Sequence, residues 1–98
     1  MNLVEIKEII DNAISSIAGI VEITPLEAEN NVDFENTGLI VKTNPKHEDL
    51  IDITIGLVIM NNISAKNIVE EIHQIVTYYL AQKSLSLGSL TIYIKGIK

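Results

Sequence analysis

The chain has 98 residues, of which 47% are hydrophobic, and its formal net charge at pH 7 is −6. All seven basic residues are lysines, and there is no cysteine. The absence of cysteine excludes disulfides, thiolate catalysis and cysteine-based zinc sites. The acidic, arginine-free composition argues against nucleic-acid binding, because that affinity comes mainly from neutralising phosphates.

The length predicts one domain spanning residues 1–98. Nineteen isoleucines but one phenylalanine and no tryptophan predict a core of branched aliphatic side chains, which favour strands. No apolar run approaches the ~20 residues that cross a bilayer, and residues 1–10 do not resemble a secretory signal. We therefore expect a cytoplasmic protein without a membrane span.

The first predicted element is an amphipathic helix, because apolar residues recur at helical spacing from Leu3 to Ile17. Gly19 follows the last of them and fits a helix C-cap. A phosphate-binding loop would place its glycines between a strand and the start of a helix, which is the reverse order. Gly19 is therefore interpreted as a joint between the helix and the first strand.

Three strands are predicted next, at residues 20–24, 38–43 and 50–60, and an acidic connection at 26–37 separates the first two. Alternation is clearest in the third strand, where every second residue is apolar and predicts one buried face. These residues are Ile51, Ile53, Ile55, Leu57 and Ile59.

A second helix is predicted from residue 65 to about residue 82, with Ser64 as its N-cap. Residues 84–88 are interpreted as a linker, and Leu90 to Lys95 as the last strand. The element order is then α-β-β-β-α-β. Two helices with one apolar stripe each predict an α+β two-layer sandwich, with both helices on one face of a mixed sheet.

Apolar side chains on the opposite strand faces are the candidate contacts with other proteins. Val58, Met60 and Tyr93 are the leading candidates, and Leu39 and Val41 are further ones. An outward patch of aromatic and aliphatic groups indicates a protein partner or self-association.

Two alternative functions use other residues. Glu70 and His73 have the Glu-x-x-His spacing found in di-iron bundles, so a small metal- or ligand-binding protein or enzyme subunit is one alternative, with His47 as a further ligand. A nucleic-acid-binding βαβ surface is the other. No serine or histidine spacing indicates a nucleophile and its base. We therefore expect no catalytic residue, metal or cofactor.

Most of the chain resembles the alkaline shock protein family, over residues 4–24 and 38–97. The strand "IDITIGLVI", the closing strand "LTIYIKGI" and the joint "SIAGIVEI" carry the resemblance. The chain departs from the family pattern where Met60-Asn61-Asn62 replaces a common Tyr-Gly, and where the acidic connection replaces a glycine-rich insert.

The resemblance implies a non-enzymatic, self-associating protein with a role in general stress or the cell envelope. Some members are held at the membrane by a separate anchor protein, so the resemblance also implies a membrane-anchored protein partner. The family pattern marks the core, and no functional residue transfers from it to this chain.

Overall fold

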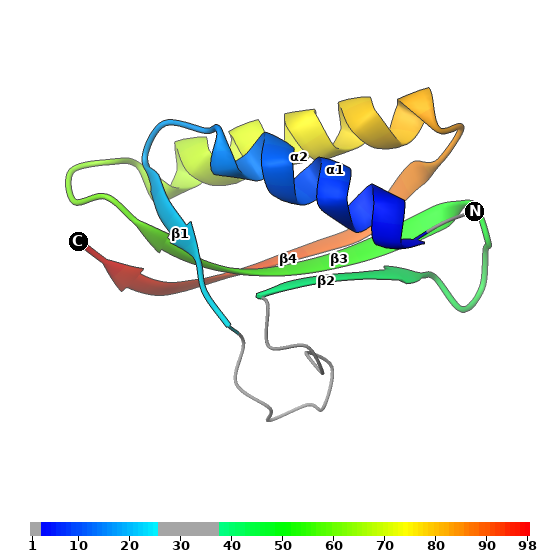
Figure 1. Ribbon diagram of the computed structural model, residues 1–98, viewed down its shortest axis with the longest axis horizontal. Coiled ribbons are helices and arrows are strands. Elements are labelled where there is room, and N and C mark those ends of the chain that lie inside the picture. Colours follow the sequence, from blue (N-terminus) through cyan, green and yellow to red (C-terminus); the bar gives the residue numbers. More distant parts are fainter. Residues whose placement is uncertain (1–2, 26–37) are drawn as a thin grey trace.

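The computed structural model describes residues 3–25 and 38–98, so the predicted acidic connection at 26–37 lies outside the described residues. Both helices lie on one face of the sheet, so the predicted two-layer α+β architecture and its element order are confirmed (Figure 1). The elements are α1 (Leu3–Ser15), β1 (Ile20–Ile23), β2 (Leu39–Thr43), β3 (Leu50–Ile59), α2 (Ala65–Gln82) and β4 (Ser86–Ile97).

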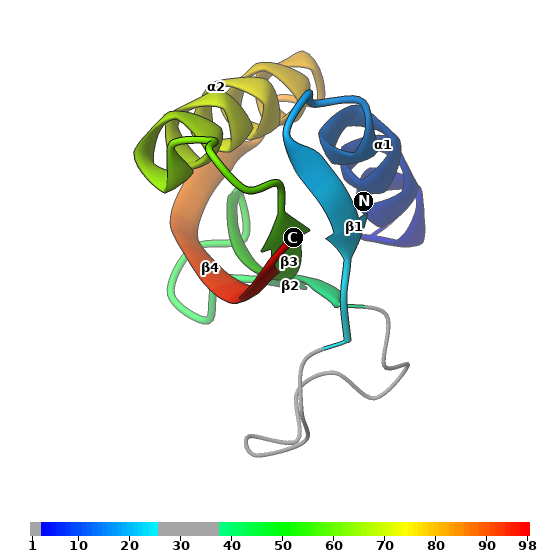
Figure 2. The ribbon, with the colours of Figure 1, turned by 90° about the vertical axis from the view of Figure 1, so that its left-hand side faces the viewer.

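β3 is the central strand of the sheet. β4 pairs with it in parallel along its whole length, whereas β1 and β2 pair with it antiparallel. Because β4 occupies one edge of β3, β1 and β2 share the other edge, β1 opposite residues 57–59 and β2 opposite residues 51–55. Seen end-on, α2 lies over β4, and α1 lies over the side of β1 and β2 (Figure 2).

β1 and β2 meet end to end at Gly56. The Thr24 N–H donates to the Gly56 carbonyl at 2.8 Å, and the Gly56 N–H donates to the Gly38 carbonyl at 2.8 Å. Gly38 has φ +83°, and a Cβ there would collide with the Thr24 carbonyl. β1 and β2 thus lie in line along the same edge of β3. The chain leaves this edge after Thr24 and returns to it at Gly38, and both residues bond to Gly56.

The core lies between the sheet and the helices and is wholly aliphatic. The predicted alternation in β3 is confirmed, because its five apolar positions are at most 2% exposed. Burying each such side chain contributes about 1.5–3 kcal/mol to the free energy of unfolding. The helices contribute Ile6, Ile10, Ile14, Ile68, Ile72, Val76 and Leu80.

The helix ends follow local capping. The predicted Ser64 N-cap is confirmed, since its hydroxyl accepts a hydrogen bond from the Asn67 N–H at 3.3 Å. α1 ends at Ser15, two residues earlier than predicted, and a turn follows. Gly19 is therefore not the helix C-cap that the sequence predicts; it closes the turn with φ +98°, and its carbonyl accepts the Met60 N–H at 2.8 Å. An added Cβ at Gly19 would lie 3.0 Å from Ile68 Cδ1, so the joint packs tightly against α2.

Two sequence predictions about the strands are wrong. Leu39 and Val41 face the helices, because they pair with the core residues Ile55 and Ile53. The predicted linker at 84–88 is largely strand, since β4 begins at Ser86. The Ser86 N–H donates to the Asp49 carbonyl at 2.9 Å. Pairing with the long β3 therefore keeps the serine- and glycine-containing start of β4 extended, although these residues form strands poorly.

Candidate functional site

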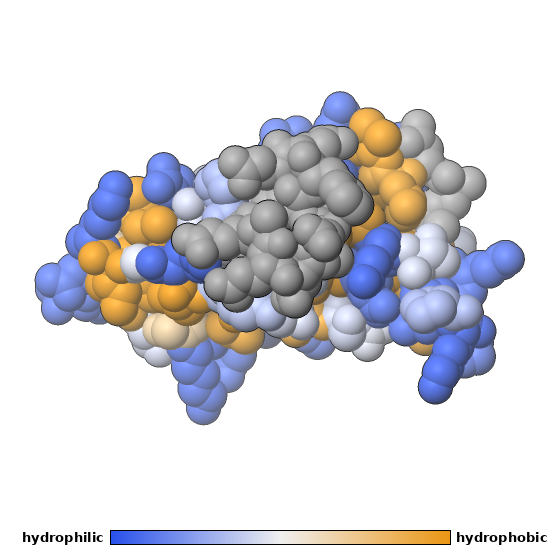
Figure 3. Space-filling view, turned by 90° about the horizontal axis from the view of Figure 1, so that it is seen from below, coloured by the Kyte–Doolittle hydropathy of each residue, from blue (hydrophilic) through white to orange (hydrophobic). Residues whose placement is uncertain are grey.

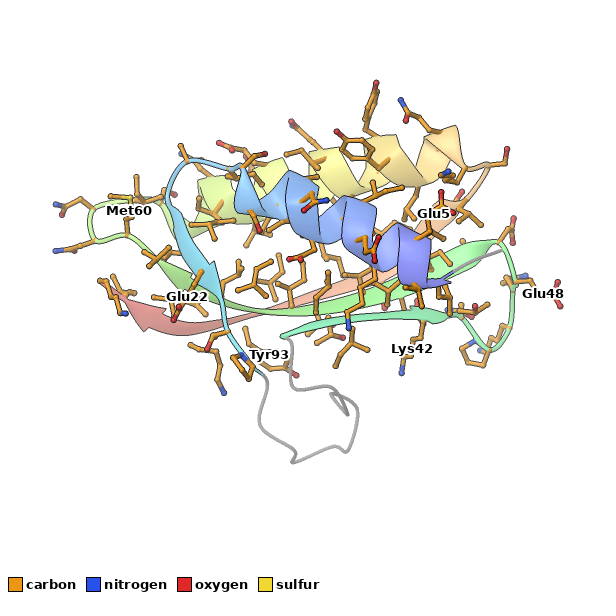
Figure 4. All side chains as sticks on the ribbon, in the orientation of Figure 1. Glu5, Glu22, Lys42, Glu48, Met60 and Tyr93 are labelled. Carbon is orange, nitrogen blue, oxygen red and sulfur yellow. The ribbon has the colours of Figure 1, made fainter. Side chains whose placement is uncertain are left out.

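The three predicted contact residues lie in two places. Val58 and Tyr93 are on the outer face of the sheet, away from the helices: Tyr93 pairs with Gly56, and Val58 pairs with Glu22 and Gly96. Met60 lies just beyond the end of β3. In Figure 4, Tyr93 lies beneath the sheet and Met60 lies at the end of the molecule, so the three do not form one cluster.

Exposure separates the three further. Val58 is 7% exposed, although it lies outside the main core cluster. Tyr93 is 47% exposed and Met60 is 50% exposed. Tyr93 and Met60 therefore remain available for contact, whereas Val58 is available only over a small area.

β4 has an open edge next to Tyr93. One edge of this 12-residue strand bonds to β3, and no strand in residues 3–25 or 38–98 pairs with the other. Such an edge presents a row of backbone N–H and C=O groups to another chain. Ile94 and Ile97 pair with the buried Leu57 and Ile59, yet they are 37% and 65% exposed.

Exposed apolar residues gather where β3 and β4 end. Met60 and Ile63 follow β3, and Ile94 and Ile97 end β4; the Lys98 N–H donates to the Ile59 carbonyl at 2.9 Å and joins the two segments. Figure 3 shows hydrophobic patches toward this end, on the left, interspersed with hydrophilic residues. Sequence reasoning missed Ile94 and Ile97 as surface residues, because alternation marks Ile94 as core and Ile97 lies beyond the predicted last strand. Both lie toward the C-terminal end of the edge strand, whereas Leu90 and Ile92, earlier on the same strand, are half-buried against the core.

Charge is sparse along β4. Lys95 is its one charged residue, although the chain carries a net charge of −6. Edge strands in natural proteins are commonly protected by inward charges, prolines or short length. β4 contains no proline and is long, so its bulges and Lys95 are its main protection against pairing.

The metal-binding alternative finds little geometric support. Glu70 and His73 are both exposed on α2, and His47 is exposed in the turn between β2 and β3, where the labelled Glu48 extends outward (Figure 4). Within residues 3–25 and 38–98, no group of three His, Cys, Asp or Glu side chains could hold a metal ion.

A depression between the two helices is small. It is lined mainly by Ile6, Ile9, Tyr79 and Leu80 and encloses only about 10 Å³. Typical ligand pockets enclose ~300–1,000 Å³. The Lys83 Nζ to Glu5 Oε1 ion pair, at 3.0 Å, lies at one end. The depression is therefore a shallow helix–helix groove rather than a pocket of ligand size.

In the part of the chain that the structure describes, neither helix has the length and apolar character that a bilayer crossing requires. Comparisons with protein-family models, curated proteins and solved structures find no match to this chain.

Proposed function

We propose that this chain is a non-enzymatic, self-associating protein that presents the open edge of β4 to copies of itself or to a membrane-anchored protein. Its role would then be one in the cell envelope or general stress, as the sequence resemblance to alkaline shock proteins implies. Cytoplasmic location and attachment to a membrane through the partner belong to the same proposal.

The observation that carries the proposal is the open, nearly uncharged edge of β4, with exposed side chains at Tyr93, Ile94 and Ile97. An exposed sheet edge can bind a further strand by main-chain hydrogen bonds, while side chains on alternate positions supply specificity. Aromatic residues are enriched at the centre of protein interfaces, which favours Tyr93 as a contact.

The experiment compares Tyr93→Asp with Val21→Asp. Tyr93 is 47% exposed on β4, and Val21 is 43% exposed on β1 at the opposite edge of the sheet. Each variant therefore places the same charge at a similarly exposed site, one on each edge. Sedimentation is measured over a wide concentration range, and each tagged variant is also recovered from its native cell with its bound proteins.

We expect the wild type and Val21→Asp to associate alike, and Tyr93→Asp to lose self-association, a membrane-anchored partner, or both. Thermal unfolding checks that both variants are folded. The proposal is wrong if all three chains stay monomeric at every concentration and recover the same proteins from the cell.

A further inference from the structure

We infer that β4 pairs with β4 of a second copy, antiparallel, around a two-fold axis that passes through Ile92. The inference rests on the proposed function and makes it specific: the partner is a second copy of this chain, and the register is fixed. The two sheets would then join into one continuous sheet, with all four helices on the same face.

Self-complementarity of β4 is the first argument. Read outward from Ile92, the aliphatic residues and the glycines match in kind on both sides, and an antiparallel pair around a two-fold axis places each of them opposite its match. The opposed pairs are Thr91 with Tyr93, Leu90 with Ile94, Ser89 with Lys95, Gly88 with Gly96, and Leu87 with Ile97.

The register with β3 supports the same centre. β4 pairs regularly with β3 from Ser89 to Ile94, and its pairing shifts by one residue at Gly88 and again at Lys95. Such bulges bend a strand and interrupt pairing. The straight part of the edge is therefore Ser89 to Ile94, whose middle falls at Thr91 and Ile92, and this is where the two copies would meet.

Neighbouring registers fit less well. In an antiparallel pair, residues directly opposite each other point to the same face of the sheet. The two-fold axis must therefore pass through a residue, because an axis between two residues would pair inner with outer side chains. Centring the pair on Leu90 or on Ile94 places Ile92 opposite Gly88 or Gly96, and leaves an isoleucine without an apolar neighbour. Centring on Thr91 places Ile94 opposite Gly88, and centring on Tyr93 places Leu90 opposite Gly96. The Ile92 register alone keeps Leu90, Ile92 and Ile94 in one apolar row.

Charge complementarity favours a second copy as the occupant. In this register Lys95, at the bulge that ends the straight part, comes next to Ser89 of the second copy, and Ser89 itself pairs with Asp52. The serine is short, so the Lys95 side chain can extend past it toward Asp52 of the second copy. Asp52 is half-buried and accepts hydrogen bonds from Asn44 Nδ2 at 3.3 Å, which holds the carboxylate in place. Two such pairs form, and opposite charges thus meet between two chains that are each acidic.

The interface would also cover Ile94, which is 37% exposed on the helix side of the edge. Its opposite residue, Leu90 of the second copy, is half-buried on the same side. Pairing therefore adds apolar contact to the new main-chain hydrogen bonds. The straight stretch is short, so we expect a dimer that forms reversibly as the concentration rises.

Cysteine cross-linking tests the register directly, because the chain has no cysteine of its own. Thr91→Cys and Tyr93→Cys chains, distinguished by a mass tag, are mixed and oxidised at a concentration where the wild type sediments as a dimer. Thr91 and Tyr93 of different copies are opposite each other, whereas two copies of the same site are about 7–8 Å apart, which is beyond disulfide reach. A mixture of Glu22→Cys and Lys42→Cys chains is the control on the other edge.

We expect the mixed Thr91–Tyr93 dimer to exceed the same-site dimers by at least about tenfold, and the control mixture to give no such preference. Equal yields of mixed and same-site dimers overturn the inference, and so does stronger cross-linking at the other edge. A monomeric wild type also overturns it. In that case, loss of a membrane-anchored partner by Tyr93→Asp would still support the proposed function, so the two failures are distinguishable.

Discussion

The two edges of the sheet are built differently. The edge formed by β1 and β2 consists of a 4-residue and a 5-residue strand, and the chain leaves the sheet between them. Glu22 and Lys42 place charges along it. The edge formed by β4 is a single 12-residue strand with one charge. The first edge therefore has the features that prevent strand addition, and the second largely lacks them.

The difference between the two edges indicates that another chain would associate through the β4 edge. If the sheet had to remain monomeric, the longer and less charged edge would be the one in need of protection. The short, interrupted edge is protected instead, and the long edge carries the exposed Tyr93, Ile94 and Ile97. One protected edge and one open edge would limit pairing to two copies, since strand addition at β4 leaves only protected edges outside.

The largest expected effect concerns a glycine on each edge. Gly38→Ala forces a side chain into a positive φ and into the Thr24 carbonyl, so we expect the free energy of unfolding to fall by at least about 2 kcal/mol. Gly96→Ala is the matched control on β4, because its Cβ would lie an ordinary 3.7 Å from Val58 Cγ2.

Urea denaturation measures both variants. We expect Gly96→Ala to stay within about 0.5 kcal/mol of the wild type, because its site has room and no positive φ. Equal losses of unfolding free energy in the two variants would contradict this difference. They would mean that the close meeting of β1 and β2 at Gly38 is no more sensitive to a side chain than β4 is at Gly96.

An intermediate effect is expected in amide hydrogen exchange. The β4 amides that point away from β3 should exchange about tenfold more slowly when about nine tenths of the chains are dimeric, because only the monomer exposes them. The amides on the outer edge of β1 and β2 should exchange at a rate independent of concentration. Protection that rises on the β1 and β2 edge instead would reverse the assignment of the two edges.

The smallest expected effect is the coupling between Lys95 and Asp52 of the second copy. A double-mutant cycle with Lys95→Gln and Asp52→Asn, read as the dimer dissociation constant, should give a coupling of about 0.2–1 kcal/mol. The coupling should weaken with added salt, since the pair is close to solvent. Strictly additive effects of the two substitutions would show that these side chains do not meet across the interface.

The sequence predicts the elements of this fold well where one pattern dominates. The five alternating apolar residues of β3 and the apolar stripe of α2 each match one period, and Ser64 has the chemistry of an N-cap. β2 is less clear, because Leu39, Ile40 and Val41 are all apolar. The alternation in its five residues therefore does not show which face of the strand is buried. Its orientation is decided by the pairing with β3, which local sequence does not contain.

The candidate site was only partly predictable for a similar reason. Tyr93 could be assigned to the outer face from alternation within β4. Ile94 looks like core because it has the right phase, and yet it is 37% exposed on an edge beyond which no strand of the described chain lies. Val58 shows the opposite case, since it lies on the outer face and is nevertheless 7% exposed. Exposure therefore depends on which elements are neighbours, and that is a property of the assembled sheet.

Because Thr24 and Gly38 both bond to Gly56, the chain between them is a suitable place for an insertion. Because the chain departs and returns at one point, the spacing between the two strand halves does not depend on how many residues lie between them. The entropic cost of closing such a loop grows only slowly with its length. We therefore expect an insertion between Thr24 and Gly38 to leave both the register of β1 and β2 on β3 and the β4 edge on the far side of the sheet unchanged.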